Sequence, residues 1–363
     1  MTDIDTVARL ARRYDMPFED VLFIALNANG VNLECSYNRM RTALRLTNAE
    51  LFGYASERNE LDYYFAVPIN NNSPFRVMGN QLSLQEIIIG RTIGLTEDIC
   101  DSHYPRRNGT SINLNPNTRT SCHGCKFCYT AYQVPCDRKK LKDADDLEAF
   151  FNGWMQEHCL SDLSNLIQVS VVTGCYQNGM EICTFLLALK SVLSRHKFKG
   201  SIFYLGSQIS TEKELSCLTT LRPFSICYSL ETFERRELLR DKKRSLTIQR
   251  ACELMDCAKG LRYETSFSYI VGIESLDVIE KYLGHMKEHV NKFPIVNTLQ
   301  LHKYHEVTIA DPAASNLDYY LKTRKLFERI FSDTKMRPLV WENYRSLWFL
   351  KFGNEPLYGI RTP

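Results

Sequence analysis

The chain has 363 residues, of which 44% are hydrophobic and 24% are charged, the ordinary balance of a globular protein. Its formal net charge of +3 is too small to indicate nucleic-acid binding through bulk electrostatics. No apolar run reaches the ~18 residues that span a bilayer, and the acidic N-terminus lacks the apolar core of a secretory signal. We therefore expect a cytoplasmic protein with no membrane partner.

Residues 1–108 carry no chemical motif, and we predict that they form a mainly helical N-terminal extension. Residues 5–14 have the apolar spacing of a short amphipathic helix. Ser83 and Glu86 have the spacing of a capping box, which predicts another helix over residues 83–89.

From residue 109 the pattern changes to β-branched runs that alternate with amphipathic segments. Predicted strands cover residues 110–115, 168–173, 201–205, 224–230, 263–271 and 296–304. Predicted helices cover residues 145–159, 180–195, 247–258, 276–290 and 316–331. This alternation implies a parallel sheet with right-handed crossovers. The sequence therefore predicts an α/β protein with a partial (β/α)6 barrel over residues 109–312. A final helix and an aromatic-rich tail, residues 313–363, are expected to pack on the barrel.

The strongest chemical signal is the segment Cys122-His123-Gly124-Cys125-Lys126-Phe127-Cys128, in which a thiol recurs at every third position. Thiolates are soft ligands, so this segment is expected to bind an iron–sulfur cluster or zinc. A structural zinc ion is usually bound by four protein ligands, and His123 or Cys136 would supply the fourth. A cubane held by three cysteines leaves one iron open to a substrate or cofactor. The position of the segment, directly after a predicted strand, favours the cluster.

The other cysteines mostly occur singly within apolar patterns, and the total of 13 cysteines in the chain is odd. This usage favours a reducing compartment over a disulfide framework. We interpret five of them as small buried apolar residues: Cys35, Cys183, Cys217, Cys252 and Cys257.

The stretch NLNPNTRTSCHGCKFCYT, residues 113–130, resembles the first strand and cluster loop of the radical S-adenosylmethionine (radical SAM) family, including the aromatic Phe127. The resemblance implies a barrel of that type and a [4Fe–4S] cluster on Cys122, Cys125 and Cys128, with S-adenosylmethionine on the fourth iron. The usual family spacing is one residue longer between the first two cysteines. A shortened loop and a replacement by Cys136 therefore both remain open.

The resemblance also implies that cofactor contacts lie at the carboxyl ends of the strands. The implied cofactor-binding residues are Phe127, Thr173, Gly174, Gln208, Ser229, Glu231, Gly272 and His302. Thr173 and Gly174 would meet the methionine amino group, Glu231 the ribose, and Gly272 the adenine. Each has a structural alternative, such as a helix cap for Glu231 or a simple turn for Gly272.

We predict an enzyme that cleaves S-adenosylmethionine reductively and abstracts hydrogen from a small molecule, with oxygen-sensitive chemistry and a low-potential donor such as flavodoxin or ferredoxin. Nucleic acid is not the expected partner. Cys175, at the predicted end of the second strand, is a candidate hydrogen-atom donor, and simple packing is its alternative. Two other functions remain open: modification of RNA or a peptide by the same chemistry, and a zinc-stapled binding module without catalysis.

Overall fold

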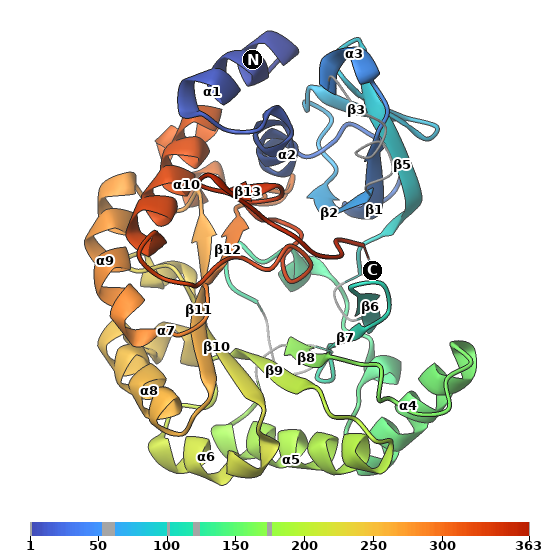
Figure 1. Cartoon of the computed structure of the whole chain (residues 1–363), viewed down its shortest axis with the longest axis vertical. Coiled ribbons are helices and arrows are strands. Elements are labelled where there is room, and N and C mark those ends of the chain that lie inside the picture. The colour runs from blue at the N-terminus through green and yellow to red at the C-terminus, as the bar shows by residue number, and fades with distance from the viewer. Residues whose placement is uncertain (1, 53–61, 100–101, 119–123, 173–175, 363) are drawn as a thin grey trace. The chain divides into compact units, whose positions relative to one another are not determined.

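The computed structural model describes residues 2–52, 62–99, 102–118, 124–172 and 176–362 (Figure 1). The chain forms two compact units. Unit 1 combines Met1–Asp98, Tyr269–Gly284 and Ile295–Thr362, whereas unit 2 combines Ile99–Ser268 and His285–Pro294. Within the described residues, no helix has the length and apolarity that crossing a membrane requires.

A seven-stranded sheet has the strand order β12-β11-β10-β9-β8-β7-β6, so neighbours in the sheet are also neighbours along the chain. Its strands are β6 (Tyr104–Arg106), β7 (Ser111–Leu114), β8 (Gln168–Val172), β9 (Ser201–Gly206), β10 (Phe224–Glu231), β11 (Glu264–Val271) and β12 (Ile295–Thr298). The pairs from β7 to β10 are parallel, and β6 adds an antiparallel edge beside β7.

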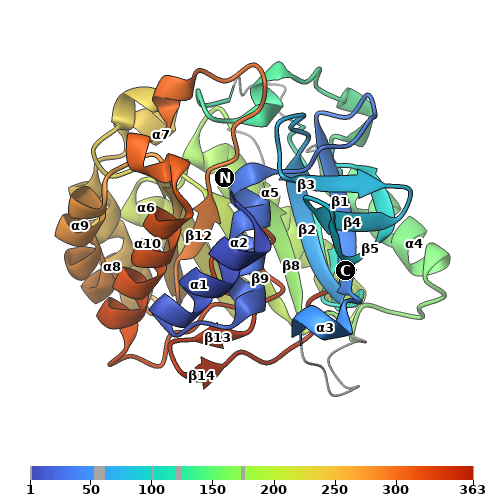
Figure 2. The same cartoon turned by 90° about the horizontal axis from the view of Figure 1, so that it is seen from above.

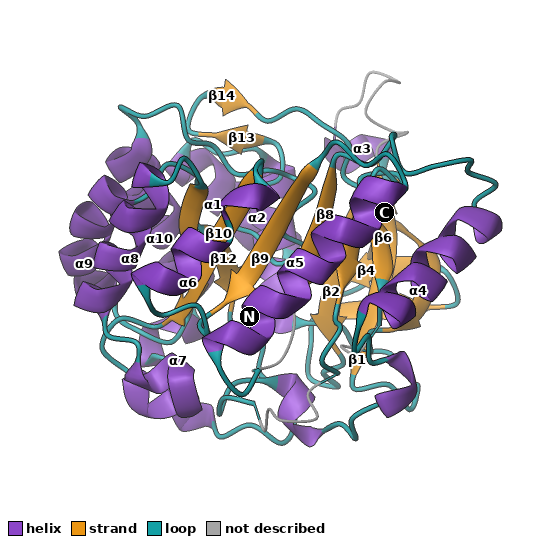
Figure 3. Cartoon of the chain, turned by 90° about the horizontal axis from the view of Figure 1, so that it is seen from below, coloured by secondary structure: helices purple, strands orange, loops and turns teal. Residues whose placement is uncertain are grey.

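Helices connect these parallel strands. They are α4 (Ala144–Glu157), α5 (Gly179–Arg195), α6 (Glu212–Cys217), α7 (Asp241–Ser245), α8 (Ile248–Gly260), α9 (Leu276–His289) and, after β12, α10 (Leu317–Phe331). Side-chain caps fix several of their starts; Asp143 begins α4, and Thr211 forms a capping box with Glu214 at α6. Helices α5 and α6 cover one face of β8 and β9 (Figures 1 and 3). The predicted mixed α/β fold is confirmed.

The last predicted strand, residues 296–304, is too long, because β12 ends at Thr298. The Leu299 amide still donates to the Val271 carbonyl at 2.8 Å, and the chain then turns, with the His305 amide bonded to the His302 carbonyl at 2.9 Å. The alternating apolar residues Leu299 and Leu301 imitate a strand, but the backbone there closes a turn.

The prediction of a mainly helical N-terminal extension is wrong. Two helices, α1 (Ile4–Tyr14) and α2 (Phe18–Asn29), precede a five-stranded antiparallel sheet of order β2-β1-β5-β4-β3. Its strands are β1 (Arg39–Leu46), β2 (Asp62–Pro68), β3 (Phe75–Met78), β4 (Gln81–Leu84) and β5 (Ile87–Glu97), with the short helix α3 (Ala49–Phe52) after β1.

The predicted helix over residues 83–89 is instead the hairpin between β4 and β5. Gln85 takes a left-handed φ of 53° at the turn. The β-branched run Ile87-Ile88-Ile89 prefers an extended strand, and pairing with neighbouring strands overrides the local capping pattern.

The C-terminal tail, which includes β13 (Lys351–Phe352) and β14 (Glu355–Pro356), lies within unit 1. The Phe349 ring lies 5.1 Å from the Phe23 ring of α2 and 5.5 Å from the Phe65 ring of β2, between centroids. The Thr298 amide of β12 donates to the Arg345 carbonyl at 2.8 Å. Helices α1, α2 and α10 are neighbours in the same unit (Figure 2). The two ends of the chain therefore share one apolar core.

Candidate functional site

The cysteine loop follows β7, and its first cysteine, Cys122, lies outside the described residues. The Cys128 amide donates to the Cys125 carbonyl at 2.9 Å, so these two cysteines share one tight turn. The Lys126 amide donates to the Leu238 carbonyl at 2.9 Å. This bond fastens the loop to the segment that follows β10.

The two described loop thiols differ in environment. Cys125 is 7% exposed, whereas Cys128 and Phe127 are half-buried. Burial raises the pKa of Cys125 to about 11, and the positive charge of Lys243 opposes this rise. The electrostatic contributions of Lys243 and Glu231 mean that the loop lies near the charged residues after β10. A soft thiol donor therefore stands beside a cation that favours its ionised form.

Glu231 ends β10 with a left-handed φ of 65°, which a non-glycine residue rarely adopts. Its side chain is buried, and Oε1 lies 3.0 Å from Nζ of Lys243. The next helical turn, at Arg236–Leu238, begins five residues later, so Glu231 does not cap it. Backbone strain at a buried carboxylate with a fixed cationic partner is a common feature of functional sites.

Arg236 organises this segment, a role that the sequence does not predict. Its guanidinium donates to the carbonyls of Leu230, Thr232 and Leu246 at 2.7, 2.9 and 2.7 Å, and also to that of Lys243. One side chain thus joins the end of β10 to the residue that pairs with Glu231. Nothing local distinguishes Arg236 from the other charged residues around it, so no sequence signal identified this role.

One face of the unit 2 sheet is polar. Burial raises the pKa of Tyr228, and Cys257 of α8 raises it further, so the Tyr228 hydroxyl lies on the helix-covered face. Ser229, the next residue of β10, therefore points to the opposite face. Asn113 pairs with Ser170 across β7 and β8. Asn113, Ser170 and Ser229 are buried. Asn113 Oδ1 and Ser229 Oγ have no hydrogen-bond partner among the described residues. Buried polar atoms of this kind suit a ligand or ordered water.

Gln208 follows β9 and is buried. Its Oε1 accepts a 2.7 Å hydrogen bond from the Tyr204 hydroxyl. A Cβ on Gly206 would lie 2.0 Å from that hydroxyl, so only glycine leaves room for the Tyr204 ring to fold back. The structure therefore gives Gln208 a role in the strand-to-helix turn, and its cofactor role remains a prediction.

Gly272 follows β11 with φ of 115°, a conformation that favours glycine. An added Cβ would lie 2.9 Å from Leu299 Cβ, and the Gly272 amide donates to the Tyr319 hydroxyl at 3.2 Å. Protein atoms of unit 1 thus explain the glycine without a ligand, and the predicted adenine contact remains a prediction.

His302 does not lie on a strand, contrary to the prediction. It is buried in the turn after β12, where Nδ1 lies 3.2 Å from the Asn38 carbonyl and the ring stacks on Tyr304 at 5.4 Å between centroids. Its amide donates to Nδ1 of His305 at 3.1 Å. On a strand the two histidines would face opposite ways, but the turn brings their rings together.

Acidification should destabilise the protein partly through His302. Burial lowers the pKa of His302 from 6.5 to about 3. Between these two pH values the unfolded chain binds a proton at His302, whereas the folded chain leaves the ring neutral. The contribution of His302 to the free energy of unfolding is therefore complete above about pH 6.5 and is lost as the pH falls toward about 3. At about pH 5 the loss amounts to ~2 kcal/mol. Urea unfolding of wild type and His302→Gln at about pH 7.5 and about pH 5 measures it. A gap between the two proteins that does not change with pH would contradict the prediction.

The predicted site residues divide between the units. Unit 2 contains Cys125, Phe127, Cys128, Gln208, Ser229 and Glu231, and unit 1 contains Gly272 and His302. The predictions for Cys122, Thr173, Gly174 and Cys175 concern positions outside the described residues. Of the described set, the structure brings Cys125, Cys128 and Glu231 into one neighbourhood.

No protein-family model and no curated protein matches the chain. Crystal structures of SuiB from Streptococcus suis show some likeness. For SuiB itself the TM-score is 0.43 at 15% identity, covering 64% of this chain and 49% of SuiB. For SuiB bound to S-adenosylmethionine the TM-score is 0.41 at 14% identity, covering 60% of this chain and 47% of SuiB.

For SuiB bound to the precursor peptide SuiA, the TM-score is 0.38 at 14% identity, covering 54% of this chain and 40% of SuiB. The chain thus matches less than half of the length of SuiB in each case. These scores and identities are too low to assign the chain to a family. Ligand and peptide binding are properties of SuiB.

Proposed function

We propose that this chain is a radical SAM enzyme whose core is a partial (β/α)6 barrel. The observation that carries the proposal is the loop of Cys122, Cys125 and Cys128, which leaves the end of the first parallel strand. The bond from Lys126 to Leu238 ties that loop to the segment after β10. Active sites of β/α folds gather at this end of the strands.

The donor set fits a [4Fe–4S] cluster. Cys125 and Cys128 share one turn, and three thiolates suit a cubane with one open iron. Lys243 lowers the pKa of Cys125 against the effect of burial, which favours the ligating thiolate. When bound, the cluster and S-adenosylmethionine supply reductive cleavage to a 5′-deoxyadenosyl radical that abstracts hydrogen.

The surrounding residues would bind and orient S-adenosylmethionine. The ion pair with Lys243 holds the Glu231 carboxylate in place, where it would accept hydrogen bonds from ribose hydroxyls. Ser229 lies two residues before Glu231 on β10. We assign the remaining contacts by the same proposal: Phe127, Thr173, Gly174, Gln208, Gly272 and His302.

The proposed substrate is a small molecule, and the electron donor is a low-potential protein such as flavodoxin or ferredoxin. A near-neutral net charge gives no electrostatic basis for holding a polynucleotide. The buried polar residues Asn113, Ser170 and Ser229 would pair with hydroxyl or amide groups of a bound small molecule. Cys175, after Gly174, is the proposed hydrogen-atom donor.

Anaerobic reconstitution with iron and sulfide tests this function. We expect a brown protein that forms 5′-deoxyadenosine from S-adenosylmethionine when dithionite is added. Small-molecule fractions of a cell extract should raise that yield, whereas stimulation by peptide or RNA fractions alone would overturn the substrate class. Cys175→Ala should still form 5′-deoxyadenosine but divert the substrate product. A colourless protein whose zinc is lost when Cys122, Cys125 and Cys128 are all replaced by alanine would overturn the proposal and support a zinc-stapled module.

A further inference from the structure

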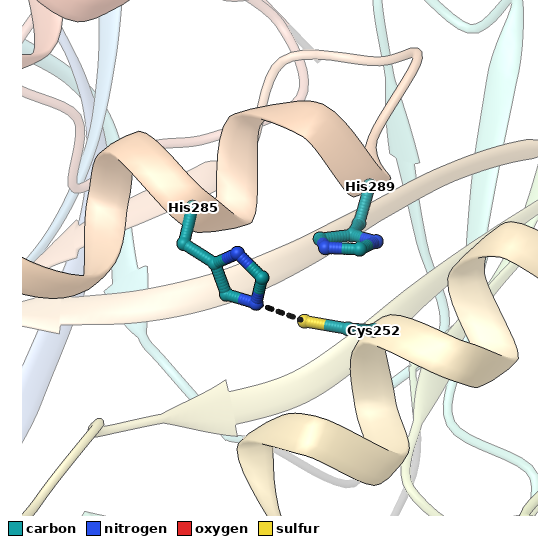
Figure 4. A group of neighbouring side chains, drawn as sticks. All are labelled: Cys252, His285 and His289. Atoms are coloured by element: carbon teal, nitrogen blue, oxygen red, sulfur yellow. Dashed lines mark hydrogen bonds between the residues drawn. The ribbon is translucent and has the colours of Figure 1, made fainter.

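Helices α8 and α9 bring three metal-ligating side chains together in unit 2 (Figure 4). Cys252 comes from α8, and His285 and His289 come from α9. Their ligand atoms all lie within 4.8 Å of one another, and Cys252 Sγ is 3.8 Å from His285 Nε2. The sequence predicts that Cys252 is a small buried apolar residue. It is buried, but its thiol faces two imidazoles.

The spacing of these residues explains the cluster. His285 and His289 are four residues apart, so they lie on one face of α9, one turn from each other. Cys252 and Asp256 have the same spacing on α8. Asp256 Oδ2 lies 2.8 Å from His289 Nδ1, and Asp256 Oδ1 lies 2.9 Å from Lys259 Nζ. The contact with Asp256 leaves Nε2 of His289 as the nitrogen available for another partner, and a carboxylate–histidine pair of this kind orients metal ligands.

The distances suit a tetrahedral metal ion. Zinc bonds of about 2.3 Å to sulfur and about 2.0–2.1 Å to nitrogen imply a separation of ~3.6 Å between a sulfur and a nitrogen ligand. The observed 3.8 Å between Cys252 Sγ and His285 Nε2 is close to this value. The ligand atom of His289 lies within 4.8 Å of the other two. One thiolate with two imidazoles is a donor set that zinc favours.

The burial of the three ligands differs in a way that provides an entry path. Cys252 is buried, His289 is half-buried, and His285 is exposed. An ion could therefore enter from the solvent beside His285 and displace the thiol proton on binding. The rival interpretation is plain helix packing, since Cys252 Sγ also lies 3.6 Å from Met286 Sδ.

We propose that Cys252, His285 and His289 form a binding site for a divalent transition metal of the zinc class. Water fills its fourth position, and Asp256 orients His289. The site joins α8 to α9 and stabilises their packing. The site shares no residue with the cysteine loop, so the proposal of a metal site does not depend on the proposed radical chemistry.

Zinc binding to the full-length chain tests the proposal. The loop variant Cys122→Ala/Cys125→Ala/Cys128→Ala removes competing thiols, and it should still retain one zinc ion per chain after dialysis. Within that variant, a chelator competition should show that His285→Gln weakens zinc binding by more than ~100-fold. Asp256→Asn should weaken it by ~10–100-fold, as is usual for residues that orient ligands. Cobalt in place of zinc should produce a thiolate charge-transfer band.

Two controls make the outcome decisive. Cys257→Ser lies on the same helix as Cys252 but outside the cluster, and it should leave zinc affinity unchanged. His285 is exposed, so His285→Gln should fold normally, and circular dichroism checks this. A loop variant that retains no zinc, or equal zinc affinity in all variants, would overturn the metal site. The cluster colour of the intact chain would be unaffected by that result.

Discussion

Cys125→Ala should abolish iron retention after anaerobic reconstitution. Of the two loop cysteines that the structure describes, Cys125 is the buried one, and it shares a turn with Cys128. Its loss would leave two thiolates for a cluster that needs three. We expect iron and sulfide contents to fall by more than ~10-fold, together with the visible absorbance. The production of 5′-deoxyadenosine should be lost with them.

The matched control is Cys136→Ala, which removes a half-buried thiol eight residues beyond Cys128. This variant should retain iron, sulfide and activity, and Cys122→Ala and Cys128→Ala should behave like Cys125→Ala. If Cys136→Ala loses the iron while Cys122→Ala keeps it, Cys136 is a ligand and the assignment of the loop is wrong.

Arg324→Met should strongly destabilise the protein. Arg324 of α10 is 1% exposed and forms ion pairs with Asp20 at 2.9 Å and Glu328 at 2.8 Å. It also donates to the carbonyls of Leu347 and Lys351 at 2.9 and 2.6 Å. Removing the cation leaves two buried acids without their partner, at a cost of about 3–5 kcal/mol in the free energy of unfolding. Urea unfolding, followed by tryptophan fluorescence, measures the loss.

The burial of Arg324, more than its charge, explains the expected loss of stability. Asp20 also accepts hydrogen bonds from the amides of Phe349 and Leu350 at 2.9 Å, so the network fastens the tail to α2. Arg329 lies on the same helix, but its ion pair with Glu280 has side chains that are 64% and 57% exposed. Arg329→Met should therefore change stability little. Equal losses in the two variants would show that the buried network does not hold unit 1 together.

Most strands and helices between residues 110 and 331 were predictable because each carries its own pattern. Apolar runs such as Gln168–Val172 and amphipathic stretches such as Gly179–Arg195 encode their structure locally. The N-terminal sheet was not predictable, because β1 pairs with β5 some fifty residues along the chain. Ser83 and Glu86 imitate a capping box whose helix never forms.

The candidate site was likewise predictable only where its residues lie close together in the sequence. The cysteine spacing was visible in the sequence, since ligands on one short loop need no folding to be adjacent. The role of Arg236 and the pairing of Glu231 with Lys243 depend on how the segment after β10 turns back on itself. No local pattern specifies that turn.

By itself, the sequence determined the alternating strands and helices and the thiol-rich loop, because both depend on residues close together along the chain. Only the tertiary structure decided the antiparallel N-terminal sheet, the turn that buries His302, the Arg324 network and the grouping of Cys252 with His285 and His289. Each of these joins residues that are distant in sequence or depends on a turn set by its surroundings. Burial, ion pairing and ligand geometry are properties of atoms that folding brings together.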